Sequence, residues 1–117
     1  MRMWMVDPKK ICNQHLLGEH VECHMLLGSL KKQKKLDGFV KNGLIQPLAL
    51  EERHNRLVVE MKRRGMNHQS PLKVLKKDIK YLPENVLQAR VNKSKSLRDL
   101  LGRCQKCREM NKQNMTG

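Results

Sequence analysis

The chain has 117 residues, enough for one domain with a modest hydrophobic core. Its 25 lysine and arginine residues against 11 aspartate and glutamate give a net charge of +14, for which a polyanion is the natural partner. With only Trp4, Phe39 and Tyr81 as aromatic residues, a base-stacking platform of the single-strand-binding type is not expected. No apolar run approaches the roughly 20 residues that a membrane-spanning helix needs, so no membrane association is expected.

The first residues lack the apolar core of a signal peptide, so we expect a cytoplasmic protein, or a nuclear one in a eukaryotic host. The four cysteines are then expected to be reduced. Apolar residues 3–6, before the turn at Asp7 and Pro8, are predicted to pack on the core and to hold the terminal amine in place. Because Arg2 is large, we expect the initiator Met1 to be retained.

A first long helix is predicted from about Cys12 to about Leu30, with Asn13 as its N-cap. His15, Glu22 and Ser29 are seven residues apart and form a polar stripe beside the face that is expected to meet the core. Partial desolvation there would raise the pKa of Glu22, so this residue is either an acid–base group or an ordinary surface carboxylate. The predicted core face comprises Cys12, Leu16, Cys23, Leu26, Leu27 and Leu30.

A cationic run at residues 31–35 (KKQKK) follows, either as a solvated loop or as a phosphate contact. Turns are expected at residues 37–38 and 42–43. A second helix is predicted to begin within residues 47–50 and to end before Gly65, as a C′ glycine would require. Its predicted inner face comprises Leu50, His54, Leu57, Val58 and Met61.

After a break at residues 70–71, we predict a loop or short helix over residues 72–81 and a helical stretch from Pro83 to about Val91. Ser94 or Ser96 is expected to cap a last helix. The predicted fold is all-α: one compact domain over residues 1–110, a small bundle of about three main helices with long loops, followed by a polar, frayed tail at residues 111–117. The apolar positions of the last helix are Leu97, Leu100, Leu101, Cys104 and Cys107.

Two groups of residues could bind metal. Cys104 and Cys107 form a CxxC pair without a second pair at matching spacing, which favours buried core thiols over zinc. His20 and His24 are four apart on one helix face, but the glutamate between them is not in the order typical of zinc proteases. No metal or other cofactor is therefore expected, and a nuclease using these histidines and a nearby glutamate is the weaker alternative.

Arg2, residues 7–11 and the run Gln-His-Leu-Leu-Gly-Glu-His-Val-Glu at residues 14–22 resemble the pyrimidine-dimer DNA glycosylases of the phage endonuclease V type. Residues 53–54 and 64–71, including His68, are similar to shorter members of that family, as is the CxxCR at residues 104–108. The resemblance covers roughly residues 1–108. Its specific part is Gln-His-x-x-x-Glu-x-x-Glu at a fixed distance from the N-terminus.

The resemblance implies a repair enzyme whose terminal α-amine attacks the sugar C1′ of a damaged nucleotide, forms an imine and cleaves the strand by β-elimination. It assigns the amine to Met1, the supporting glutamate to Glu22, a phosphate contact to Arg2 and site-lining roles to Gln14 and His15. An α-amine has an ordinary pKa of about 8, against about 10.4 for lysine, which makes the terminus the better nucleophile at neutral pH. Lys31, Lys32, Arg63 and Arg64 are expected to contact DNA.

Two arginines of the phage enzyme correspond to Val21 and Met25 in this chain, and its aromatic C-terminus is replaced by residues 108–117. The expected function is that of a DNA glycosylase and abasic-site lyase acting as a monomer on damaged duplex DNA, at pyrimidine dimers or abasic sites. The alternative of another class is a basic DNA-binding protein that has lost the chemistry. That alternative predicts tight, salt-sensitive binding and no covalent intermediate.

Overall fold

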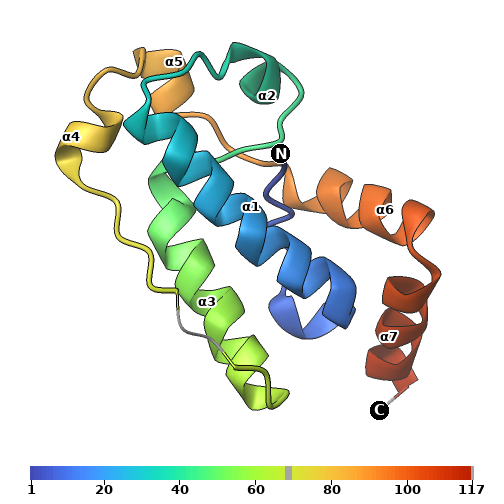
Figure 1. Cartoon of the computed structure of the whole chain (residues 1–117). Helices are drawn as coiled ribbons and strands as arrows, with labels where there is room; N and C mark the ends of the chain where they lie inside the picture. The colour runs from blue at the N-terminus through green and yellow to red at the C-terminus, as the bar shows by residue number, and fades with distance from the viewer. Residues whose placement is uncertain (68–69, 117) are drawn as a thin grey trace.

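The computed structural model describes residues 1–67 and 70–116, so the expectations for His68 fall outside it. In those residues the chain forms α-helices and short 3-10 helices and no strand, which confirms the all-α prediction. Figure 1 shows their arrangement. The elements are η1 (Pro8–Lys10), α1 (Asn13–Lys31), α2 (Asp37–Lys41), η2 (Pro47–Ala49), α3 (Leu50–Arg63), α4 (Lys76–Ile79), α5 (Glu84–Leu87), α6 (Lys93–Arg103) and α7 (Gln105–Thr116).

Helices α1 and α3 form the centre of the fold and lie side by side in opposite directions (Figure 1). The predicted faces are confirmed: all the expected residues of α1 and α3 are buried except Leu27 and Val58, which are half-buried. Glu19 also belongs to that face, although its charge did not suggest it. Its carboxylate accepts two hydrogen bonds from the buried Arg53 guanidinium, at 2.6 and 2.8 Å.

The N-terminal segment packs on the core, as predicted. Met3, Trp4 and Val6 are buried. The Met3 N–H donates to the Leu44 carbonyl at 2.7 Å, and the Ser96 hydroxyl donates to the Trp4 carbonyl at 2.6 Å. These bonds fix the backbone on both sides of Met3 and so hold the terminus over α1.

Several predicted helix ends were wrong. Cys12, and not Asn13, is the N-cap of α1, and it makes no capping side-chain bond. Asn92 caps α6 by accepting a hydrogen bond from the Lys95 N–H, because the predicted cap Ser96 is buried and bonded to Trp4. Helix α5 ends at Leu87 instead of reaching Val91. The C′ role of Gly65 is confirmed by its φ of +81°.

The C-terminal part differs most from the prediction. The expected last helix is interrupted at Cys104, whose extended backbone (φ −125°, ψ 111°) separates α6 from α7. Helix α7 then lies against η1, and it continues to Thr116 where a frayed tail was expected. Over the described residues, no helix has both the length and the apolar character needed to cross a bilayer.

Candidate active site

Glu22 and the N-terminus meet on the exposed side of α1. The Glu22 carboxylate lies near enough to the Arg2 backbone N–H and to the Met1 ammonium group for both to lower its pKa. Burial raises the pKa of Glu22 above its ordinary value and the nearby Glu19 charge adds to this, while the Met1 ammonium and the Arg2 N–H act against it. The net effect is a raised pKa, which makes the protonated form of this carboxyl more accessible than that of a fully exposed glutamate.

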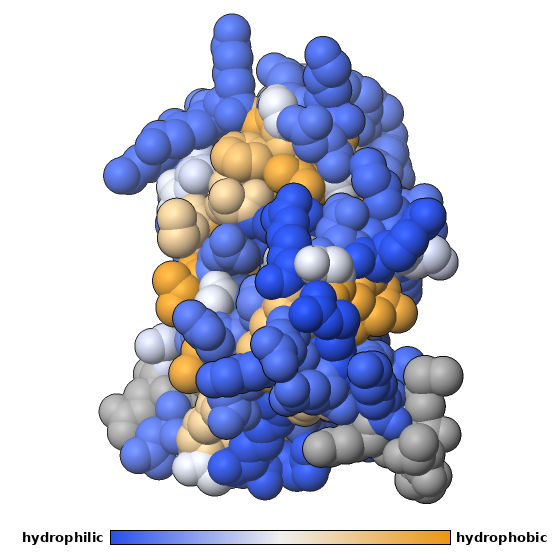
Figure 2. Space-filling model, turned by 90° about the vertical axis from the view of Figure 1, so that its right-hand side faces the viewer, coloured by the Kyte–Doolittle hydropathy of each residue, from blue (hydrophilic) through white to orange (hydrophobic). Residues whose placement is uncertain are grey.

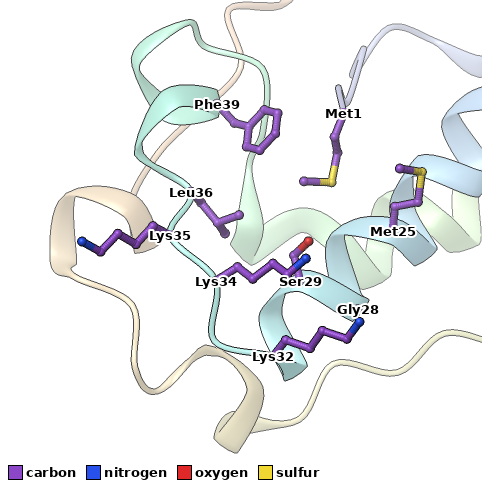
Figure 3. A pocket seen from close by; sticks show the side chains of 9 residues that line it. All are labelled: Met1, Met25, Gly28, Ser29, Lys32, Lys34, Lys35, Leu36 and Phe39. Atoms are coloured by element: carbon purple, nitrogen blue, oxygen red, sulfur yellow. The ribbon is translucent and has the colours of Figure 1, made fainter.

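The Met1 side chain lines a cavity of about 540 Å³ between α1 and α2. Figure 3 shows it between Phe39 and Met25, with Lys34 and Ser29 below. The cavity is lined by three lysines of the cationic run, Lys32, Lys34 and Lys35. An apolar wall beside three cations suits a ligand that combines a flat base or sugar with phosphate.

The Arg2 guanidinium donates to Asp99 at 2.9 Å and stacks over the Trp4 ring, 4.0 Å from its centroid. Its Nε is buried and makes no hydrogen bond to any residue that the structure describes. Arg2 also lines a second cavity, of about 300 Å³, together with the basic residues Lys41, Arg90 and Lys95. Met1 and Arg2 therefore line two different cavities, and each cavity is also lined by three lysine or arginine side chains.

Only some of the other predicted site residues lie at the Met1 cavity. Lys32 lines the Met1 cavity, but Lys31 lies 3.6 Å from the buried Asp78. Gln14 is exposed, and His15 faces Cys12 and Cys107. The structure therefore does not place Gln14 or His15 beside the Met1 cavity.

Arg63 and Arg64 lie at the end of α3 and both bind Glu60. These bonds overcome the effect of burial and lower the pKa of Glu60 to about 2. Arg64 also donates to the Asn13 side chain and to the Pro8 carbonyl, which joins α3 to the start of α1. Arg64 thus has a structural role, and the DNA contact expected of both arginines stays a prediction.

The histidines of the alternative nuclease site, His20 and His24, meet His54 of α3 with ring centroids 4.9 Å apart in each pair. The third potential metal ligand beside His20 and His24 is thus a histidine, whereas a glutamate was expected. The His54 Nε2 lies 3.1 Å from the Ser70 carbonyl and its Nδ1 lies 3.0 Å from the Asn55 side chain. His54 would have to give up one of these bonds to bind a metal, which weakens the nuclease alternative.

Lys41, Arg90 and Lys95, which the fold brings to Arg2, were not predicted as site residues. They come from three separate segments, and only the charge excess hinted at them. The run at residues 31–35 did point to Lys34 and Lys35, as part of a possible phosphate contact.

A family model described as pyrimidine dimer DNA glycosylase matches residues 1–74, which is more than half of the chain. The match includes Met1, Arg2, Glu22 and the α1–α3 pair, and it ends before α6 and α7. No curated protein and no solved structure matches the chain.

Proposed function

The chain belongs to the pyrimidine dimer DNA glycosylase family, whose substrate is DNA, and we propose that it also cleaves the strand as an abasic-site lyase. In this proposal the α-amine of Met1 is the nucleophile, Glu22 is the acid–base group, and the substrate is damaged duplex DNA bound by a monomer. The proximity of the Met1 amine to the half-buried Glu22 carboxylate is the observation that supports this assignment most directly.

The neutral Met1 amine attacks C1′ of the damaged nucleotide, and the glycosidic bond breaks with its electron pair leaving on the base. The departing base takes up the proton that the attacking nitrogen loses. Glu22 in its protonated form donates to the sugar ring oxygen, so that the ring opens and the nitrogen–carbon bond becomes an imine. The Glu22 carboxylate, ionised by that donation, then takes a proton from C2′, and the electron pair of the broken C–H bond moves towards the imine and expels the 3′ phosphate oxygen. Water finally hydrolyses the imine and frees the amine.

Glu22 can serve both proton transfers because burial raises its pKa towards the working pH. In its ionised form it stabilises the positive charge that develops on the sugar and on the imine nitrogen. The N-terminal backbone, fixed at Met3 and Trp4, keeps the amine near this carboxylate before substrate arrives, which reduces the entropic cost of the attack.

The two basic cavities suggest how the DNA strand lies. Lys32, Lys34 and Lys35 face one side of the terminus, and the group around Arg2 faces the other. Phosphates bound in both cavities would place the intervening nucleotide over the Met1 amine. The orphaned Arg2 Nε is a donor that a phosphate oxygen can satisfy. Access to C1′ would require the nucleotide to be partly unstacked.

The proposal is tested with duplex DNA that carries one abasic site, incubated with and without EDTA, and with either the untagged chain or a chain extended by two residues before Met1. The untagged chain is expected to cleave, whereas the extended chain should bind equally well and cleave at least 100-fold more slowly, since acid–base and nucleophilic alignment contribute about that much. Equal cleavage by both chains would contradict the role of Met1.

Binding without cleavage by either chain would support the non-catalytic DNA-binding alternative. Cleavage that EDTA abolishes would support the nuclease alternative.

A further inference from the structure

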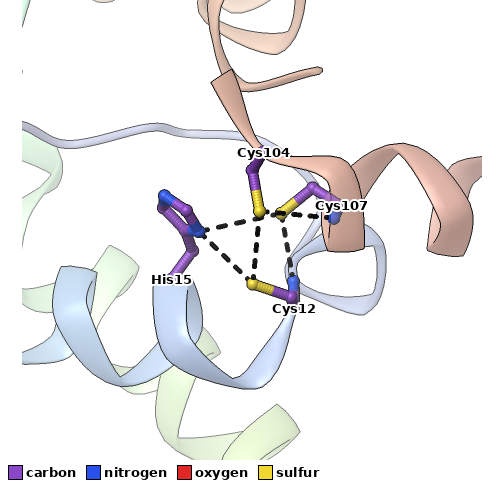
Figure 4. A group of neighbouring side chains, drawn as sticks. All are labelled: Cys12, His15, Cys104 and Cys107. Atoms are coloured by element: carbon purple, nitrogen blue, oxygen red, sulfur yellow. Dashed lines mark hydrogen bonds between the residues drawn. The ribbon is translucent and has the colours of Figure 1, made fainter. Parts of the chain in front are cut away.

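Four potential metal ligands from the two ends of the chain converge beside η1 (Figure 4). They are Cys12 and His15 at the start of α1, and Cys104 and Cys107 at the start of α7. We propose that these four residues bind one structural zinc ion, which fastens α7 to α1. The proposal is independent of the chemistry assigned to Met1 and Glu22.

The distances between the ligand atoms match a tetrahedral site. Zn–S bonds of about 2.3 Å and Zn–N bonds of about 2.0–2.1 Å place two sulfurs about 3.8 Å apart, and a sulfur and a nitrogen about 3.6 Å apart. The Cys12 and Cys104 sulfurs are 3.8 Å apart. The His15 Nδ1 lies 3.3 Å from the Cys12 sulfur and 3.9 Å from the Cys107 sulfur. All four ligand atoms lie within 4.8 Å of one another.

The two ligand pairs have the same local geometry. Cys12 directly precedes α1 and His15 is the third residue of that helix, while Cys104 directly precedes α7 and Cys107 is its third residue. The second pair that the CxxC lacks in sequence is therefore the CxxH at residues 12–15. Three thiolates and one imidazole without an exogenous ligand are a donor set typical of structural zinc.

Backbone amides already point at two of the sulfurs. The Cys12 N–H lies 3.3 Å from the Cys107 sulfur, and the Cys107 N–H lies 3.5 Å from the Cys104 sulfur. Hydrogen bonds of this kind favour the thiolate form that a metal requires and orient it. Cys104 and Cys107 are therefore held with their sulfurs towards Cys12 and His15, as Figure 4 shows.

Little of helix α7 is buried against the rest of the fold. Of its residues up to Lys112, whose side chains the structure describes, only Cys107 is buried, with Met110 and Asn111 half-buried. The Asn111 side chain adds one hydrogen bond to the Lys10 carbonyl, at 3.1 Å. So small a buried surface gives limited net free energy against the entropic cost of ordering the helix. A bound zinc ion would supply that free energy directly.

The experiment is elemental analysis of the untagged full chain, purified in reducing buffer without chelators and supplied with zinc during expression. About one zinc ion per chain is expected. Cys104→Ala should abolish the bound zinc, while Cys23→Ala, a change at a buried cysteine outside the cluster, should retain it. His24→Asn should also retain it, which separates this site from the histidines at the α1–α3 interface.

Cobalt(II) provides a second readout that needs no variant. Replacement of zinc by cobalt should give the visible absorption of a tetrahedral ion and the near-ultraviolet charge-transfer bands of thiolate ligands. A fully reduced chain without bound zinc, a disulfide between Cys104 and Cys107 in its place, or an octahedral cobalt spectrum would overturn the proposal. Metal retained by Cys104→Ala would do so as well.

Discussion

Glu22, the proposed acid–base group, carries a cost to stability. Its carboxyl is half-buried beside apolar residues, and the raised pKa shows that the protonated form is more favoured in the folded chain than in the unfolded one. Below the unfolded-state pKa of about 4.3 this preference contributes fully to stability, and the contribution is lost as the pH rises through the higher folded-state pKa. At neutral pH the ionised carboxylate therefore destabilises the fold relative to a neutral side chain.

We predict that Glu22→Gln raises the free energy of unfolding at pH 7 relative to the unsubstituted chain, and raises it less at pH 4. The same variant should retain DNA binding and cleave abasic-site DNA about 10²–10⁴-fold more slowly, as expected for loss of an acid–base group. Urea unfolding at the two pH values and single-turnover cleavage measure the two effects. Glu52→Gln, an exposed change on α3, is the control and should alter neither. Wild-type cleavage by Glu22→Gln would remove this carboxylate from the mechanism.

The other glutamate of the family-like run, Glu19, has a structural role. It forms a bidentate ion pair with Arg53, and both side chains are almost fully excluded from solvent. We predict that Glu19→Gln costs about 3–5 kcal/mol in the free energy of unfolding, because it leaves the Arg53 charge buried without its counter-charge. Urea unfolding of the purified variant measures this loss.

The control for that prediction is the double variant Glu19→Leu plus Arg53→Met, which removes both charges and should recover much of the loss. A loss below about 1 kcal/mol in the single variant would show that the pair is not the link between α1 and α3 that its burial indicates.

At the scale of the helices, the faces of α1 and α3 could be predicted because apolar residues recur at helical spacing. Glu22 could be placed beside the core for the same reason. The break between α6 and α7 could not be predicted, because Cys104 and Cys107 fit the same helical spacing as Leu97 and Leu100. The Cys104 sulfur lies 3.8 Å from that of Cys12, 92 residues away in sequence, and no local spacing indicates this contact.

Residues of the candidate site could be proposed from the sequence where the information was local, and less so where it depended on the fold. Met1 and Glu22 were inferred from the resemblance, and they lie close together in the structure. The cavity around Arg2 requires α2, the segment before α6 and α6 itself to meet, and no spacing rule links Lys41, Arg90 and Lys95. That Gln14 and His15 line the site stays a prediction, although the contacts of His15 favour a role in the cysteine cluster.

The loop after α1 is the element expected to bind phosphate. We predict that Lys34→Ala plus Lys35→Ala weakens duplex binding and lowers the slope of log K against log salt by about 0.9 for each phosphate that the variant no longer neutralises. Fluorescence anisotropy at several salt concentrations measures both quantities. Lys9→Ala plus Lys62→Ala removes the same charge near the opposite end of α1 and is the matched control. Equal effects of the two double variants would show that binding depends on net charge alone.

For the molecule as a whole, the fold brings the N-terminal segment between α1 and α6 and leaves basic cavities on both sides of it. Figure 2 shows one face of the molecule, where hydrophilic side chains predominate and apolar ones form separate small areas. Together with the charge of +14, such a surface favours electrostatic attraction to DNA over apolar docking. The proposed zinc ion would add a fixed connection between the two ends of the chain.

The central claim is that the Met1 α-amine forms a covalent imine with DNA. The most direct measurement is borohydride trapping of the untagged chain on abasic-site duplex DNA, followed by proteolysis and mass spectrometry of the cross-linked peptide. Borohydride reduces an imine to a stable amine, so we predict an adduct on the α-nitrogen of the peptide that begins with Met1. An adduct on a lysine with none on Met1, or strand cleavage without any trapped adduct, would contradict the claim.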